Sequence, residues 1–267
     1  MNLDQAAALN RDNWDSVRRQ RDLGLIPKHH DVAADLLAGK TCLSQAQREL
    51  LGDVAGKRLL DLGCGDGFEL LEWARAGADV VGVDVSPRQL AAARRAAERL
   101  GLSCRLVRAD FLRLPEELLQ AEFDVVFSAW TTAWIGDLGR WFSAVFRALK
   151  PGGVFLLSGA HPLSGFIGEL QRGERRRLRY EDGGPFVETG DAVSAEWNPL
   201  GETQTTVEWR WTLGSMLTAM AQAGLRITHV KEQGEELARA KMGLGTGYPG
   251  EIVVRAVKDL FSPDSKD

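Results

Sequence analysis

Polar side chains and glycines follow three successive apolar runs in the first half of the chain. The segment 61–67, DLGCGDG, joins a short apolar run to an amphipathic stretch. Its glycines allow a sharp turn and close approach of a ligand to the main chain. Asp84 ends the next run, and Asp110 with Phe111 follows the third. Because open α/β sheets bind ligands at the carboxyl ends of their strands, these residues are expected to line one crevice.

The chemistry of these side chains suits a nucleotide. A carboxylate in the position of Asp84 accepts from ribose hydroxyls in nucleotide-binding α/β folds. Asp110 could accept from the exocyclic amine of adenine, and the ring of Phe111 could pack beside the base. Taken singly, these features are also explained by a tight turn, a helix N-cap, a turn carboxylate and a core aromatic. Their coincidence at three strand ends favours a binding site.

The spacing of the glycines weighs against a dinucleotide. The dehydrogenase fingerprint G-x-G-x-x-G would need glycine at position 68, where this chain has Phe68, and the third glycine is Gly67. The acid at Asp84 fits either cofactor. A nicotinamide-dependent oxidoreductase is therefore the less favoured alternative.

Short apolar runs alternate with amphipathic stretches, which indicates βαβ units and a doubly wound α/β fold with a sheet of about seven strands. The expected strands are 58–62, 78–84, 104–109, 123–128, 154–158, 225–230 and 251–257. The expected helices between them are 68–76, 87–100, 116–120, 138–149 and 212–223. The sequence Lys150-Pro151-Gly152-Gly153 is expected to break the chain before the fifth strand.

Four regions follow from this pattern. Residues 1–55 are expected to form a helical lid, with helices at 4–19, 31–37 and 44–51, and residues 56–161 the cofactor-binding core. Residues 162–211 are expected to be a small cap inserted after the fifth strand, irregular to about residue 201 and then a half-buried strand. Residues 212–267 would complete the core sheet.

Four segments resemble the successive motifs of the class I S-adenosylmethionine-dependent methyltransferases: LLDLGCGDGFELLEWARAGADVVGVDVS, ADFLRLP, FDVVFSAW and LKPGGVFLLSG. The resemblance covers residues 50–160. It implies a Rossmann-like, seven-stranded mixed sheet with helices on both faces and an antiparallel last inserted strand. It also implies S-adenosyl-L-methionine as cofactor, and cofactor-binding residues Asp61, Gly63, Cys64, Gly65, Asp84, Val85, Gln89, Asp110, Phe111, Ser128, Ala129 and Trp130.

Methyl transfer from a sulfonium depends mainly on alignment of the reactants. Trp130 and Trp134 are candidates for contacts with the positive sulfur, or they pack in the core. His161 directly follows the fifth strand, so it is the candidate for proton transfer, or it is bonded at the start of a loop. Either of His29 and His30 could face the acceptor from the lid, while His229 in a late strand is expected to be structural.

Two further features belong to the predicted lid and cap. Trp14 and Arg18 lie four residues apart, on one face of a helix that either closes over the cofactor or lies on the surface. The basic run from Arg172 to Arg179 either captures an anionic group of the acceptor or forms a solvated face. The sequence offers no pattern that identifies the acceptor or the oligomeric state.

Composition and charge limit the classes of binding partner that the sequence favours. The net charge of −4 and pI of about 5.7 disfavour nucleic acid, which usually requires a basic surface. Three cysteines without CxxC spacing predict neither a disulfide framework nor a metal site. No secretory signal or apolar span is visible, so a cytoplasmic location and no membrane are expected. The function expected is methylation of a small molecule; a catalytically silent cofactor-binding protein and an RNA or protein methyltransferase are the alternatives.

Overall fold

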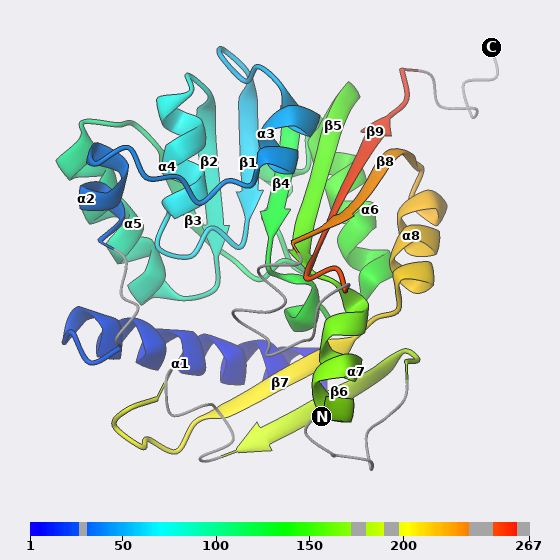
Figure 1. The fold of residues 1–267 in the computed structure, drawn as a ribbon. Coiled ribbons are helices and arrows are strands. Elements are labelled where there is room, and N and C mark those ends of the chain that lie inside the picture. Colours follow the sequence, from blue (N-terminus) through cyan, green and yellow to red (C-terminus); the bar gives the residue numbers. More distant parts are fainter. Residues whose placement is uncertain (27–30, 172–179, 190–197, 235–247, 261–267) are drawn as a thin grey trace.

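The computed structural model describes residues 1–26, 31–171, 180–189, 198–234 and 248–260. Within them, seven strands form one sheet in the order β3-β2-β1-β4-β5-β9-β8 (Figure 1). The first five pair in parallel, and β9 runs antiparallel to both β5 and β8. The strands are β1 (Arg58–Leu62), β2 (Asp79–Asp84), β3 (Arg105–Arg108), β4 (Phe123–Ala129), β5 (Leu149–Ala160), β8 (Leu225–Gln233) and β9 (Glu251–Lys258). The predicted mixed sheet and its antiparallel strand are confirmed.

Helices cover both faces of this sheet, as the near-continuous apolar strands require. Side chains alternate along β1, so that Leu59 packs with α3 (Gln45–Leu51) and α4 (Phe68–Arg75). Leu60 packs on the opposite face with α6 (Leu138–Ala148) and α8 (Leu213–Gln222). The helix α5 (Pro87–Leu100) joins the first layer and contacts α2 (Val32–Leu37).

Local signals set the bounds of α5. The side chain of Ser86 accepts a hydrogen bond from the Gln89 amide, Pro87 occupies the first turn, and Gly101 ends the helix in the left-handed region at φ 65°. Serine caps and a terminal glycine satisfy backbone groups that a helix leaves unpaired at its ends. These residues place α5 where the sequence predicts it.

Two predicted features differ clearly from the structure, while other predicted ends shift by one to three residues, as in α1 and β8. β5 begins at Leu149, which pairs with Phe123, and regular pairing resumes between Val125 and Val154. The expected break at 150–153 is therefore an irregularity inside the strand, where Gly152 adopts φ 79°. The helix expected at 116–120 is a single 3-10 turn, η1 (Glu116–Leu118).

The region predicted to be irregular contains ordered elements, so that prediction is wrong for its described parts. The helix α7 (Pro162–Gln171) follows β5, and β6 (Gly183–Thr189) pairs antiparallel with β7 (Thr205–Arg210). β6 is stabilised by a partner far along the chain, which a local pattern does not reveal.

The first helix, α1 (Leu3–Asp22), lies between the strand ends of the core and the small sheet β6–β7 (Figure 1). The side-chain amide of Asn10 donates to the carbonyl of Val207 and accepts from its N–H, both at 2.8 Å. Ala6, Val207 and Trp209 form an apolar cluster beside this link. α1 thus pairs with the outer edge of β7 as well as covering the core.

Candidate functional site

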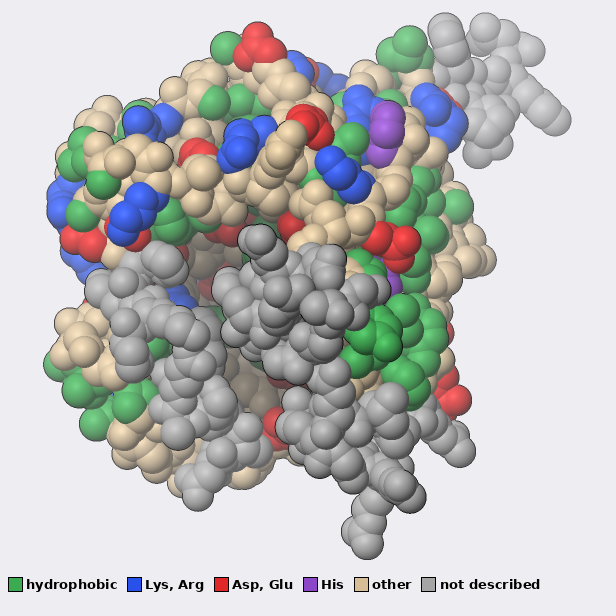
Figure 2. All heavy atoms as spheres, viewed as in Figure 1, with side chains coloured by type: hydrophobic (Ala, Val, Ile, Leu, Met, Phe, Trp, Pro, Cys, Tyr) green, Lys and Arg blue, Asp and Glu red, His purple; other side chains and the backbone are tan. Residues whose placement is uncertain are grey.

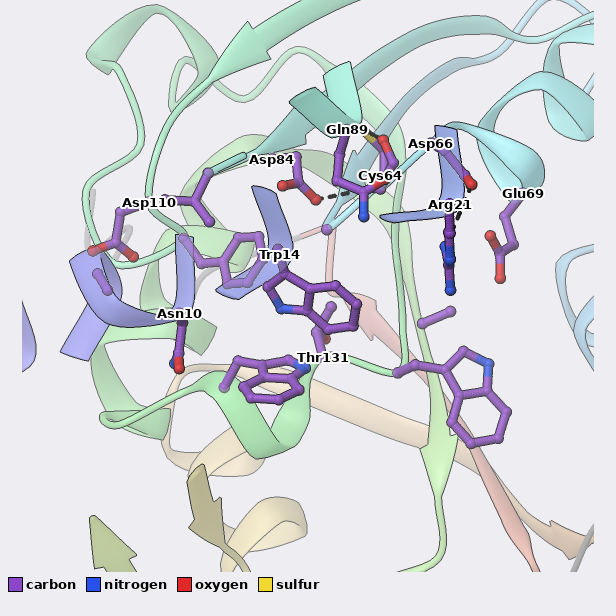
Figure 3. A pocket seen from close by; sticks show the side chains of 18 residues that line it. Asn10, Trp14, Arg21, Cys64, Asp66, Glu69, Asp84, Gln89, Asp110 and Thr131 are labelled. Atoms are coloured by element: carbon purple, nitrogen blue, oxygen red, sulfur yellow. Dashed lines mark hydrogen bonds and ion pairs between the residues drawn. The ribbon is translucent and has the colours of Figure 1, made fainter. Parts of the chain in front are cut away.

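A cavity of about 460 Å³ lies between the carboxyl ends of β1–β4 and one face of α1 (Figure 3). Its lining comes from the glycine loop and α4, the ends of β2, β3 and β4, the turn η2 (Thr132–Trp134), and α1. The lining residues are Ala7, Asn10, Trp14, Arg21, Gly63, Cys64, Gly65, Asp66, Glu69, Asp84, Val85, Gln89, Asp110, Phe111, Ala129, Trp130, Thr131 and Trp134. Of the cofactor residues predicted from the sequence, all but Asp61 and Ser128 are in this set.

Asp84 is the best-defined polar group of the cavity. One carboxylate oxygen accepts from the Gly65 amide at 3.0 Å and the other from the Ser86 amide at 2.8 Å. Burial raises the pKa of Asp84 to about 6, against the lowering effect of these two bonds, and the charges of Asp66 and Asp15 raise it further. The carboxylate is therefore fixed in place and has lost most of its water.

The glycine loop is shaped by steric contact. Gly63 adopts φ 91°, and a Cβ at this position would lie 2.4 Å from Thr131 Cγ2 and 3.2 Å from the Phe111 ring. Only glycine fits both this conformation and this space. The loop consequently exposes its main chain to the cavity, with Thr131 and Phe111 packed beside it.

Asp61 and Ser128 lie just behind the lining. Asp61 is buried, and its Oδ2 accepts no hydrogen bond from any residue that the structure describes. Burial, then the charges of Glu69 and Asp84, raises the pKa of Asp61 well above its ordinary value. Ser128 donates to the Leu62 carbonyl at 2.6 Å, which leaves its Oγ to accept from Thr131, 2.7 Å away.

Aromatic side chains gather after β4. Trp130 adopts φ 59°, a left-handed conformation that costs energy outside glycine, and its amide donates to the Ser158 carbonyl at 2.9 Å. Trp134 meets Trp14 of α1 edge to face, with ring centroids 5.4 Å apart. Both rings line the cavity, so the predicted position of Trp134 near the site agrees with the geometry.

One face of α1 forms a wall of the cavity. Ala7, Asn10, Trp14 and Arg21 recur at helical spacing on the face toward the cavity. In Figure 3, Asp110 lies on one side of Trp14, and Arg21 with Glu69 on the other. Of these four residues, only Trp14 was proposed as a site residue from the sequence. Helical spacing from Trp14 would also have predicted Ala7, Asn10 and Arg21 on the same face.

Arg18 does not reach this lining, but it fixes the wall. Its guanidinium lies 3.0 Å from the carboxylate of Asp66 and 2.7 Å from that of Asp22, and it is only 4% exposed. Arg21 stands 3.6 Å from the same Asp66. Asp66, Glu69 and Thr131 are further lining residues that the sequence argument did not assign, although the first two lie in its strongest motif.

His161 lies outside the described cavity lining. Its Nδ1 accepts from the Leu163 amide at 3.1 Å, so Nε2 carries the proton and donates to Glu232 at 2.6 Å. The ring is 2% exposed, and the backbone N–H of His161 donates to the Gly250 carbonyl. The structure therefore places this histidine between the end of β5 and the start of α7, outside the set of residues that line the cavity.

The remaining sequence hypotheses are placed as follows. His29, His30 and the run Arg172–Arg179 lie outside the described residues. His229 is exposed on β8, with its Nδ1 3.1 Å from the hydroxyl of Thr228. Among described residues, no three His, Cys, Asp or Glu side chains are grouped to hold a metal, and no helix is long and apolar enough to cross a membrane.

Comparison with known proteins identifies the family. Residues 60–157 match the model of a methyltransferase domain. The demethylmenaquinone methyltransferase of Thermus thermophilus is 32% identical over 209 residues, which are 76% of this chain and 91% of that protein. The sterol 24-C-methyltransferase of Aspergillus fumigatus is 34% identical over 80% of this chain. The matched region is only about half (49%) of the length of that sterol methyltransferase. A solved S-adenosylmethionine-dependent methyltransferase from Mesorhizobium loti superposes with a TM-score of 0.56 at 28% identity, covering 79% of this chain and 95% of that one. The chain belongs to the class I methyltransferases that use S-adenosyl-L-methionine.

Proposed function

We propose that this protein transfers the methyl group of S-adenosylmethionine to a small-molecule acceptor bound in the same cavity. The observation that carries the proposal is the buried carboxylate of Asp84, held toward the cavity by the amides of Gly65 and Ser86. A desolvated carboxylate at the end of β2 is suited to accept from a pair of ribose hydroxyls. Asp110 and Phe111 stand one strand further, where the adenine would lie.

The described residues fit this cofactor. Gln89 lines the cavity, and its buried Oε1 accepts no hydrogen bond from the described chain, so it offers a second acceptor near the ribose. A buried acceptor left without a donor costs free energy that a ligand hydroxyl or ammonium would recover. Gly65 also lines the cavity, and a Cβ there would meet no described atom within 4 Å, so the methionine end can lie against the main chain at this glycine.

When bound, S-adenosylmethionine supplies a methyl group already activated by its positive sulfur. The side chains of this protein are then required to align the reactants and exclude water. Among the described lining residues, four are acidic (Asp66, Glu69, Asp84 and Asp110) and one, Arg21, is basic, which favours a ligand of net positive charge. Trp14, Trp130 and Trp134 add aromatic faces, which attract cations without forming a full ion pair.

The acceptor is proposed to be largely apolar. Three indoles, those of Trp14, Trp130 and Trp134, line the cavity from α1, from the end of β4 and from η2, and they give its wall a large apolar surface. The relatives from Thermus and Aspergillus are named for demethylmenaquinone and a sterol, both mostly hydrocarbon. On the face seen in Figure 2, basic and acidic side chains are interspersed, which does not favour nucleic acid as the acceptor. A cytoplasmic location stays a prediction.

For His161 we propose that it positions α7 and the end of β5, because both ring nitrogens are hydrogen-bonded and the residue is not among those that line the cavity. Its predicted role in proton transfer is the alternative. That role would require the bond to Glu232 to break, with the ring then turning toward the acceptor.

Isothermal titration tests the cofactor assignment. S-adenosylmethionine and S-adenosylhomocysteine should bind, while NAD and NADP should not. Asp84→Ala should weaken the first two by about 1–3 kcal/mol through lost hydrogen bonds. Asp79→Ala is the matched control, since Asp79 lies at the opposite end of β2 with a side chain that is 72% exposed. Equal affinity in Asp84→Ala and wild type would refute the placement of the ribose.

Transfer of a labelled methyl group to a panel of acceptors tests the reaction. The panel should contain reduced naphthoquinones, sterols, catechols and short polar amines. Transfer to the apolar members supports the proposed class, and transfer to the amines alone contradicts it. Tight cofactor binding without transfer to any acceptor would favour the second candidate function, a catalytically silent binding protein with the same cavity.

A further inference from the structure

The turn between β2 and α5 carries three lining residues of the cavity, Asp84, Val85 and Gln89. Its conformation depends on Ser86, which is completely buried. The amide of Ser86 donates to Asp84 Oδ1 at 2.8 Å, and its Oγ accepts from the Gln89 amide at 3.1 Å. Ser86 therefore fixes the acceptors at both ends of the turn.

A carboxylate from outside the core completes this arrangement. Asp15 of α1 accepts from the hydroxyl of Ser86 at 2.5 Å and from the Arg88 amide at 3.2 Å. A serine hydroxyl has one hydrogen, so its donation to Asp15 leaves the oxygen lone pairs to accept from Gln89. Asp15 also satisfies an amide in the first turn of α5, where a negative charge is favoured.

From these contacts we infer that Asp15 is a positioning residue for the cofactor: it holds the Ser86 turn so that Asp84 and Gln89 face the ribose. The inference rests on the proposed function, because it assigns a role in binding the same cofactor. It makes α1 part of the ribose site, although no atom of Asp15 is needed to touch the ligand.

The negative charge of Asp15 should also affect how cofactor affinity depends on pH. Asp84 is faced by the acids Asp15 on α1 and Asp66 in the glycine loop, both of which raise its pKa, and by the amides of Gly65 and Ser86, which lower it. Asp61 on β1 lies close enough for Asp84 to raise its pKa. Arg18 and Arg21 of α1 pair with Asp66. Loss of the Asp15 charge should therefore lower the pKa of Asp84.

The test compares Asp15→Ala and Asp15→Asn with Asp12→Ala, a control on the same helix whose side chain is 64% exposed. Affinity for S-adenosylmethionine is titrated from pH 5 to 8. Asp15→Ala should bind about tenfold more weakly at pH 8, which corresponds to one lost hydrogen bond. Asp15→Asn keeps an acceptor oxygen, so it should bind nearly as tightly there. In both, the pH at which affinity falls should lie below that of the wild type, while Asp12→Ala should match the wild type.

Unchanged affinity and an unchanged pH profile in both Asp15 variants would overturn the inference and leave Asp15 as a cap of α5. If Asp15→Ala fails to fold, the pH profile of Asp15→Asn decides alone. Failure of the proposed function is distinct: the wild type itself would then bind neither S-adenosylmethionine nor S-adenosylhomocysteine, or Asp84→Ala would bind as well as wild type.

Discussion

The cavity has two walls of different construction. The strand-end wall, formed by the loops after β1–β4, is fixed by the sheet itself: β1 pairs with β2 and β4 along its length, and Gly63 is packed against Thr131 and Phe111. The α1 wall is held by side chains, among them Asp15 to Ser86, Arg18 to Asp66 and Asn10 to Val207. The first wall is therefore rigid, and the second is a set of separable contacts.

This contrast predicts different responses to mutation. At Gly63 in the strand-end wall, a single added atom would meet the packed side chains of Thr131 and Phe111. In the α1 wall each substitution removes one contact of several, so the losses should be graded.

The largest effect is expected for Gly63→Ala. The new Cβ would lie 2.4 Å from Thr131 Cγ2, at φ 91°. Affinity for S-adenosylmethionine should fall by more than about 100-fold, because the loop or the Thr131 side chain must shift by about an ångström within the binding site. The control is Gly101→Ala, in the left-handed region at φ 65° and ψ 27° with no described atom within 4 Å of its Cβ, which should cost only about 1–2 kcal/mol of stability. Titration and thermal unfolding would measure both, and cofactor binding retained by Gly63→Ala would show that this wall is not rigid.

Acidification should act next most strongly, through Asp84. Its pKa of about 6 lies above the ordinary value of 3.8, so the ligand-free protein protonates it as the pH falls through 6. Affinity for the cofactor should then fall by up to about tenfold per pH unit. The effect of Asp84 on folding has the opposite sign. Because its pKa is raised in the folded protein, the free energy of unfolding should decrease as the pH rises from about 4 through 6. Asp84→Asn should bind weakly at every pH, and a pH profile as steep as that of the wild type would assign the titration to another group.

Arg18→Met should produce a smaller loss of affinity with a clear loss of stability. The guanidinium is buried and pairs with Asp66 and Asp22, but the Asp22 side chain is 39% exposed and Asp66 keeps Arg21 at 3.6 Å, so the expected cost is about 1–3 kcal/mol. Affinity should fall only several-fold, since Asp15 and Asn10 still hold α1. Arg95→Met, which removes a 57% exposed arginine 3.5 Å from Asp22, is the control for both measurements. Equal unfolding temperatures in the two variants would argue against Arg18 as the main anchor.

The smallest effect on the cofactor is expected for His161→Ala. The ring touches Leu163 and Glu232 rather than the cavity, so affinity for S-adenosylmethionine should stay within about twofold of wild type, which is less than 0.5 kcal/mol. Loss of its two hydrogen bonds should lower stability by about 1–3 kcal/mol. A clear drop in the rate of transfer at unchanged stability would restore the predicted catalytic role.

The two walls also differ in how far the sequence predicts them. Asp84, Gly63 and Ser86 carry their own signals, because turn glycines, helix caps and strand-end acids act within a few residues of themselves. Arg21 and Asn10 belong to no local motif: the helical spacing from Trp14 places them on its face, but their partners lie about 45 and 200 residues away. The same reason explains why β6 was expected to be irregular: its ordering depends on pairing with β7 and not on its own residues. Residues 150–153 do interrupt regular strand pairing, as their sequence predicts. Pairing with β4 on both sides nevertheless keeps them within β5, where they form an irregularity.

The reciprocal bonds between Asn10 and Val207 also bear on solubility. A sheet of two strands has little stability by itself, and an edge strand with unpaired N–H and C=O groups is a template for another chain. In this protein the edge of β7 at Val207 is occupied by a side chain of α1. A shortened chain that starts after residue 22 would therefore do more than lose one wall of its cavity: it would present an open strand edge and is expected to self-associate, with the β6–β7 hairpin as the point of contact.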